Sequence, residues 1–231
     1  GIIYSQNKVA PEKIEFVRKG VRRLIFDENQ SIPLAGLYPD EIIGEETMFP
    51  VKYYSENKPE INFSEGELSF QSTRVSESSV WFGGFNPFAT YIIELDSING
   101  EGAVGFEFSD ANRKNQFILA TGFEDDLLRD VNLKIINDSA IVFNESVRIN
   151  PVPAQKLQGE IILQMLGSGF TLFHQNQGVP EVIGQSDFNH FLDLRRKDIV
   201  NSFHSSLYLN QKYGTVSLKK VHSVFSTGIG L

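Results

Sequence analysis

Aromatic side chains gather in one short stretch of the sequence, between residues 81 and 91. Two glycines and a proline accompany Trp81, Phe82, Phe85, Phe88 and Tyr91, and Trp81 is the single tryptophan of the chain. A glycine-rich loop with such rings could present them flat against the C–H face of a sugar. Alternatively, Phe82, Phe85 and Phe88 plug one end of the fold, which is the commoner use of such side chains. Trp81 and Tyr91 are the members expected to be exposed, and they are the candidate ligand-binding residues.

Asp110, Asn112 and Asn115 form a second polar group, where a turn is expected. Their oxygens are ligands that Ca²⁺ accepts, but a loop site needs about six to eight of them. An Asx-rich turn is therefore the simpler interpretation, with calcium as the alternative. The chain has no Cys, and its 4 His residues include no HxH or HxxxH pair. No metal site and no Ser-His catalytic pair is therefore predicted.

The charge balance argues against some partners. The chain has 29 acidic and 21 basic residues, for a net charge of −8, and the basic residues are scattered. A nucleic-acid partner is not expected, because such proteins concentrate basic residues on one surface. The sequence contains no run of about 18 apolar residues, so no membrane span is expected. With 41% hydrophobic residues, the chain can form a sizeable core.

Short apolar runs separated by turn residues recur at fairly even spacing, which is typical of all-β proteins. The alternation of Val104, Phe106 and Phe108 predicts a half-buried strand, and residues 103–121 are predicted to form a hairpin. Glycines at 167 and 169 predict a second hairpin, with arms at 160–166 and 170–175. Other strands are expected at 14–17, 21–26, 49–54, 67–71, 90–96, 131–137 and 214–224. We predict an all-β fold, an antiparallel two-sheet β-sandwich of the jelly-roll type.

Two segments depart from the strand pattern. Apolar residues fall at helical spacing between Phe188 and Ile199, behind Ser186 and Asp187 as candidate caps. One short helix is therefore predicted near residues 186–200. The acidic segment 124–130 is expected to be a helical turn or a solvated loop.

The length of 231 residues suits a single β-sandwich. Residues 1–60, which hold five of the nine prolines, are expected to be an N-terminal arm or extra strands. Residues 61–225 are predicted to be the sandwich domain, and the Gly-rich residues 226–231 the start of a linker, so the natural protein is expected to continue. Gly1 before two isoleucines suggests a trimmed N-terminus from which a signal peptide was removed.

Four apolar segments share a pattern of extended, small and apolar residues. They are Tyr91-Ile-Ile-Glu-Leu, Gly102-Ala-Val-Gly-Phe-Glu-Phe, Asn115-Gln-Phe-Ile-Leu and Gly214-Thr-Val-Ser-Leu-Lys-Lys-Val. On these segments the chain resembles the concanavalin A-like lectin/glucanase jelly rolls, a group that includes laminin G-like modules. It also resembles the sandwich found beside catalytic domains in secreted bacterial polysaccharide-degrading proteins. The resemblance implies a carbohydrate partner, a downstream catalytic domain in the natural chain, and a secreted, periplasmic or cell-surface location.

Retaining glycosidases of this group carry Glu-x-Asp-x-x-Glu on one strand, which places three carboxyls on the concave face. The matching positions in this chain are Glu94, Asp96 and Asn99. An amide cannot exchange the proton that the acid/base residue gives and takes, so Asn99 counts against this catalysis. No catalytic residue is predicted.

The sequence therefore favours a non-catalytic, carbohydrate-associated β-sandwich module of a secreted glycan-processing protein. Two alternatives stay open: a glycoside hydrolase whose carboxylate pair is not visible in the sequence, and a structural or adhesion module that binds protein. Two carboxyls about 5–10 Å apart beside exposed rings on the concave face would favour the hydrolase. Rings without such a pair would favour binding, and a filled apolar face would favour a structural role.

Overall fold

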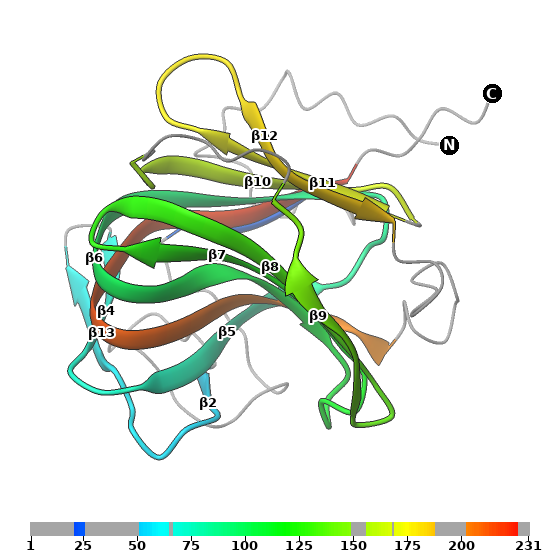
Figure 1. The fold of residues 1–231 in the computed structure, drawn as a ribbon, viewed down its shortest axis with the longest axis horizontal. Coiled ribbons are helices and arrows are strands. Elements are labelled where there is room, and N and C mark those ends of the chain that lie inside the picture. Colours follow the sequence, from blue (N-terminus) through cyan, green and yellow to red (C-terminus); the bar gives the residue numbers. More distant parts are fainter. Residues whose placement is uncertain are drawn as a thin grey trace.

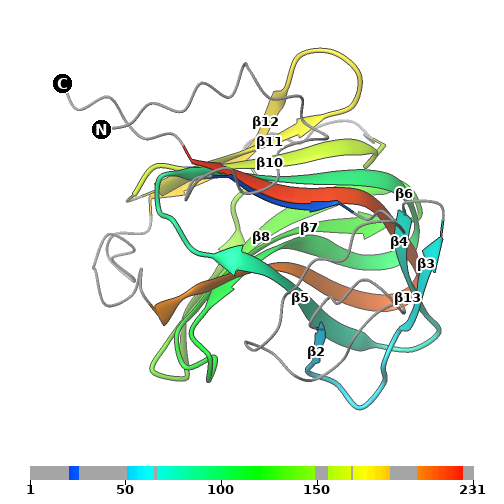
Figure 2. The same ribbon diagram turned by 180° about the vertical axis from the view of Figure 1, so that it is seen from behind.

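The chain folds into two layers of antiparallel strands. The computed structural model describes residues 21–25, 51–64, 67–148, 156–167, 169–187 and 202–225. Figures 1 and 2 show one layer above the other, joined at one end of the molecule where two long strands bend. The predicted all-β, two-sheet jelly roll is confirmed.

The first sheet has the strand order β12-β11-β10-β6-β13-β4-β3, and β1 pairs with the end of β13. These strands are β12 (Glu181–Asp187), β11 (Gly169–Gln175), β10 (Gly159–Met165), β6 (Ala89–Ser109), β13 (His204–Phe225), β4 (Glu67–Ser72), β3 (Glu60–Ser64) and β1 (Val21–Ile25). Only the first part of β6 and the last part of β13 belong to this layer, because β10 pairs with residues 90–95 of β6 and β4 pairs with residues 214–218 of β13.

The second sheet contains the other halves of the same two long strands. Its order is β9-β8-β7-β6-β13-β5-β2, as the strand pairings give it. The additional strands are β9 (Ala140–Ser146), β8 (Leu127–Asn137), β7 (Gln116–Glu124), β5 (Ser76–Gly84) and β2 (Val51–Tyr53). The strands β6 and β13 therefore pair with each other along their whole length and run through both layers.

The change of layer happens at a pair of glycines. Gly100 of β6 lies opposite Gly214 of β13, and both have positive φ, at 92° and 103°. A Cβ on Gly100 would lie 2.2 Å from the Tyr213 carbonyl oxygen, and one on Gly214 would lie 2.2 Å from that of Asn99. Only glycine combines this backbone conformation with so close an approach of two strands. We call this pair the glycine corner.

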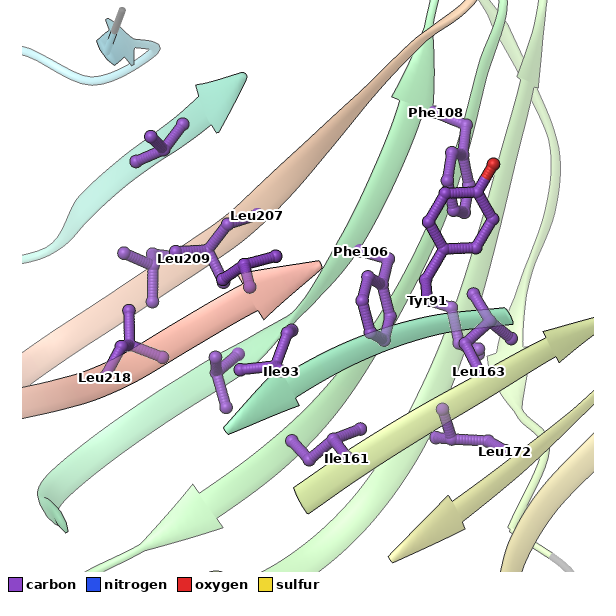
Figure 3. Packing of buried hydrophobic residues seen from close by; sticks show 14 of the residues in the cluster. Tyr91, Ile93, Phe106, Phe108, Ile161, Leu163, Leu172, Leu207, Leu209 and Leu218 are labelled. Atoms are coloured by element: carbon purple, nitrogen blue, oxygen red, sulfur yellow. The ribbon is translucent and has the colours of Figure 1, made fainter. Parts of the chain in front are cut away.

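The core fills the space between the layers. Figure 3 shows side chains from both sheets in one cluster, with Tyr91 and Ile93 from the first layer beside Phe106 and Phe108 from the second. The Tyr91 ring centroid lies 4.8 Å from that of Phe108 and 6.2 Å from that of Phe106. The alternation in the sequence explains this packing, because every second side chain of a strand points to the same side.

Both predicted hairpins are confirmed. Residues 101–109 of β6 pair with β7, and β10 pairs with β11 through a turn in which Gly167 has a φ of 79°. Residues 90–96 and 103–109, predicted as two strands, are parts of the single strand β6. The strands β3, β5, β9 and β12 and the first half of β13 were not among the expected strands.

Some predictions fall outside the part of the chain that the structure describes. These are the strand at 14–17, the segment 226–231 and most of the helix near 186–200, although Ser186 and Asp187 belong to β12. Within residues 1–60, β1 pairs with β13 and β2 pairs with β5. The boundary at residue 60 stays a prediction. Among the residues that the structure describes, no helix is long and apolar enough to cross a membrane.

The glycine corner yields a stability test. We expect Gly100→Ala to lower the free energy of unfolding by roughly 3 kcal/mol or more, from backbone strain of about 1–2 kcal/mol and overpacking of about 1–3 kcal/mol. Gly178→Ala is the matched control, because Gly178 has a φ of 115° but a Cβ added there would meet no atom within 4 Å. The free energy of unfolding of this control should fall only by the cost of backbone strain, about 1–2 kcal/mol. Equal losses in urea unfolding of the two variants would contradict the role of close strand approach.

Candidate functional site

Two groups of polar side chains lie on the outer face of the second sheet. Core residues of β6 alternate with Ala103, Gly105 and Glu107, which therefore point away from the core. Gly105 lies opposite Tyr208 of β13, and Ala103 lies opposite Asn210. This face has three zones along its strands: an ion cluster, an apolar strip and a polar pocket.

The ion cluster consists of Glu77, Glu107, Arg113 and Tyr54. Arg113 lies in the turn between β6 and β7, and its Nε and Nη2 donate to the two Glu107 carboxylate oxygens at 2.9 and 3.1 Å. The same Nη2 donates to Glu77 Oε1 at 3.3 Å, and the guanidinium lies 3.4 Å from the centroid of the Tyr54 ring. The cluster thus connects β5, β6, the turn and the residue after β2.

Glu107 is completely buried within this cluster. Burial raises the pKa of its carboxyl, while the Arg113 charge and a hydrogen bond of 2.8 Å from Ser109 Oγ lower it. A buried carboxylate needs such partners, because an unpaired charge inside a protein is costly. Glu77 and Glu107 are therefore two carboxyls on one face, but a guanidinium binds both and no surface of Glu107 is open to a ligand. The cluster fastens strands together.

The apolar strip lies beside the ion cluster. It consists of Ile118, Ala120 and Tyr208, which are buried, with the partly buried Ala103 packed against them. Burial raises the pKa of the Tyr208 hydroxyl, which accepts a hydrogen bond of 3.4 Å from Asn210 Nδ2. The middle of the outer face is therefore filled by its own side chains, which is the arrangement expected of a structural role, and the open part of this face lies beyond the strip.

The polar pocket opens where the apolar strip ends. It has a volume of about 290 Å³. Its lining residues come from β6, from the hairpin of β7 and β8, and from β13: Glu101, Gly102, Ala103, Gly122, Phe123, Glu124, Arg129, Asp130, Asn132, Asn210 and Lys212. Small residues at 103 and 122 keep the strands uncovered, while longer polar side chains surround them.

A tight turn at Asp125 and Asp126 places the hairpin wall of this pocket. Asp125 has a φ of 55°, and its N–H donates to the carbonyl oxygen of Gly100 at 2.5 Å. The N–H of Leu157 donates to the carbonyl oxygen of Asp126 at 2.7 Å. The expectation of a helical turn or loop over 124–130 is therefore wrong: Glu124 ends β7, and residues 127–130 belong to β8. Pairing with the neighbouring strand overrides the local acidic pattern.

Three polar pairs line the pocket. Lys212 forms an ion pair with Glu101, and Arg129 forms one with Glu124 at 2.6 Å. Asn132 Nδ2 donates to Asp130 Oδ2 at 2.7 Å. These carboxylate and amide groups offer acceptors and donors for a ligand rich in hydroxyl groups.

The structure places Trp81 and Tyr91 away from this pocket and away from solvent. Their exposed fractions are 4% and 0%, so the expectation that they are exposed is wrong. Trp81 belongs to β5 and not to a loop, and its ring contacts the His204 ring edge-on at 6.4 Å between centroids. Tyr91 lies in the core, where its hydroxyl donates to the Asn86 carbonyl oxygen and accepts from the Asn86 N–H, at 3.0 and 2.7 Å. The exposed member of the aromatic stretch is Phe88, at 53%.

Asp110 and Asn115 close the turn between β6 and β7. The Asp110 carboxylate accepts the N–H groups of Lys114 and Asn115 and the side-chain amide of Asn115, at 2.9, 3.1 and 2.8 Å. These bonds are those of an Asx-type turn, and Asn112 is exposed. Among the described residues, no three His, Asp or Glu side chains form a group that could hold a metal ion. Calcium binding stays a prediction.

Glu94 and Asp96, which match part of the glycosidase motif, lie in the first sheet. They form ion pairs of 2.7 Å with Lys220 and Lys219. Asn99 Oδ1 accepts the N–H of Thr215 at 3.0 Å, beside the glycine corner. The motif positions are thus occupied by bonds within the sheet, on a different layer from the polar pocket.

The sequence prediction missed Asp130 because it began the strand at Val131, and it missed Asn132 because this residue, although inside the predicted strand, belongs to no motif. The alternation of Val131, Leu133 and Ile135 already places Asn132 on the face opposite the core, and extending it by one residue would have placed Asp130 there as well. No local signal joins them to Asn210, since their place around one pocket depends on strand pairing across the sheet.

The comparisons with known proteins support the fold alone. No protein-family model and no curated protein sequence matches the chain. Solved structures do match. The fold is that of the concanavalin A-like jelly rolls. The exoplasmic/lumenal domain of VIP36, in its Ca²⁺/Man3GlcNAc-bound form, has a TM-score of 0.52 and 6% identity, over 79% of this chain and 86% of that one.

Two further concanavalin A-like matches have similar scores. The CBM2 module of an evolved Dit from Lactobacillus casei BL23 phage J-1 has a TM-score of 0.51 and 10% identity, over 93% of this chain and 100% of that one. An inactivated mutant of beta-agarase B in complex with agaro-octaose has a TM-score of 0.50 and 8% identity, over 76% of this chain and 84% of that one.

The ion cluster yields a pH-dependent prediction. In Arg113→Met, Glu107 stays buried without its cation, so its pKa rises further above the unfolded value of about 4.3. A raised carboxyl pKa in the folded state means that stability falls as the pH rises from the unfolded value through the folded one. We therefore expect a small loss near pH 4 that grows to about 3–5 kcal/mol near neutral pH.

Urea unfolding of the wild type and the Arg113→Met variant at several pH values measures this difference. Arg129→Met is the matched control, because the Arg129–Glu124 pair is about half exposed, at 54% and 51%. Its loss should stay below about 1 kcal/mol throughout. A loss in Arg113→Met that does not change with pH would contradict the proposed burial of a charged Glu107.

Proposed function

We propose that this protein is a carbohydrate-binding β-sandwich module that holds its glycan in the polar pocket. The observation that carries the proposal is the composition of this pocket. Asp130, Asn132 and Asn210 line an opening of about 290 Å³ that small residues keep accessible. Sugars present neighbouring hydroxyl groups that both donate and accept, and side-chain amides and carboxylates are suitable partners for them.

The solved structures with the same fold support a glycan as the ligand class. The VIP36 domain is described with Man3GlcNAc and the beta-agarase B mutant with agaro-octaose. Their sequences are only 6% and 8% identical to this chain, so these proteins support a glycan as the class of ligand but do not indicate which glycan is bound. A carbohydrate partner is also consistent with the predicted secreted, periplasmic or cell-surface location and with a downstream catalytic domain.

The proposed module is non-catalytic. A retaining glycosidase needs two carboxyls about 5–5.5 Å apart that both reach the glycosidic bond. Glu77 and Glu107 share Arg113, and Glu107 has an exposed fraction of 0%. Glu94 and Asp96 each form an ion pair with a lysine in the first sheet. In the pocket itself, Glu101 and Glu124 are likewise paired with Lys212 and Arg129. These ion pairs support binding over hydrolysis.

A glycan array followed by affinity gel electrophoresis tests the proposal. We expect the wild type to be retained by at least one glycan, and Asn210→Ala to bind that glycan about tenfold more weakly, the equivalent of one lost hydrogen bond. Lys219→Ala is the control, because Lys219 pairs with Asp96 in the first sheet, away from the pocket. It should bind like the wild type.

The proposal would be overturned if no glycan retained the wild type. It would also be overturned if Asn210→Ala and Lys219→Ala bound equally well, because the glycan would then contact another surface. Release of reducing sugar by the wild type would overturn only the statement that the module is non-catalytic.

A further inference from the structure

The charged groups of the polar pocket are unequally paired. Glu101 and Glu124 each bind a cation, Lys212 and Arg129 respectively. Asp130 is the third carboxylate of the pocket, and its partner among the described residues is the uncharged amide of Asn132. Both cations of the lining are therefore engaged with glutamates, while one carboxylate faces the pocket without a counter-ion among the described side chains.

Gly122 provides the space that Asp130 occupies. A Cβ at Gly122 would lie 1.8 Å from Asp130 Oδ1, so this carboxylate oxygen lies directly over the glycine. The other oxygen, Oδ2, accepts the Asn132 amide. An ionised carboxylate accepts about four hydrogen bonds, and one is used here. Asp130 is thus held in place by Asn132 and keeps acceptor capacity on the pocket side.

We propose that the polar pocket selects uncharged glycans, with Asp130 as the acceptor of sugar hydroxyl groups, and that it rejects uronic acid and sulfated sugars. This inference rests on the proposed function. A hydroxyl donated to a carboxylate forms a charge-assisted hydrogen bond, which is stronger than one between neutral groups. An anionic sugar would instead lie beside Asp130, where both cations of the described lining are already paired with glutamates, and like charges brought together across an interface reduce affinity.

The test compares each glycan with its own oxidised form. Laminarin, yeast mannan and a β-galactan serve as neutral probes, and oxidation of their primary alcohols at C6 gives carboxylated versions with the same linkages. Affinity gels are run at about 0.15 M salt, where the Debye length of about 8 Å suppresses repulsion from the distant charges of the protein. We expect at least one neutral probe to retain the wild type. The wild type should bind this probe at least tenfold more strongly than it binds the carboxylated form of the same probe.

Two variants assign the selectivity to Asp130. Asp130→Asn keeps the shape and removes the charge, so binding of the neutral probe should fall about tenfold and the ratio of neutral to carboxylated binding should shrink. Gly122→Ala should do the same, because the new Cβ displaces the Asp130 carboxylate. Gly84→Ala is the matched control, since a Cβ at Gly84 meets no atom within 4 Å. It should leave both affinities unchanged, with all variants checked by thermal unfolding.

The possible failures are distinguishable. Equal or stronger retention of the wild type by the carboxylated form would overturn the selectivity and leave glycan binding intact. An unchanged ratio in both Asp130→Asn and Gly122→Ala would remove Asp130 from the mechanism. Retention by none of the probes or of the arrayed glycans would overturn the proposed function, and the selectivity with it.

Discussion

The full-length pairing of β6 with β13 is the constraint on which the rest of the molecule depends. Each strand contributes one half to the first sheet and the other half to the second, so the two layers share a continuous set of backbone hydrogen bonds. The pair changes layer at Gly100 and Gly214, where a Cβ on either residue would collide with the backbone of the other strand. The bend brings the alternating apolar residues of both halves face to face, and the core forms between them.

The local part of this arrangement could be predicted from the sequence. The alternation of Val104, Phe106 and Phe108 and the Asx residues of the following turn indicate a hairpin, because both signals act over a few residues. The glycine corner could not be predicted in this way, because its two glycines are far apart in the chain and their structural role depends on their pairing in the fold. The strand β5 was missed because its serines and terminal glycines resemble a loop, although most of these residues are buried in the sheet.

The candidate site shows the same division. Tyr91 and Trp81 are ring-bearing residues beside glycines, and composition alone does not tell which side of a strand a ring occupies. The register of β5 and β6 decides it: Tyr91 points into the core, and Trp81 packs edge-on against His204. The polar pocket is made instead from Asp130, Asn132 and Asn210, which carry no motif. Strand pairing across four strands assembles it, so its residues become recognisable only in the fold.

The bond between the Asp125 N–H and the Gly100 carbonyl oxygen ties the tip of the β7–β8 hairpin to the place where the layers join. One wall of the pocket is thus anchored at the glycine corner. A ligand would enter a preorganised cavity and spend little of its binding energy on ordering the protein. In such a cavity, ligands differ mainly in how long they remain bound once they have arrived, and less in how quickly they arrive.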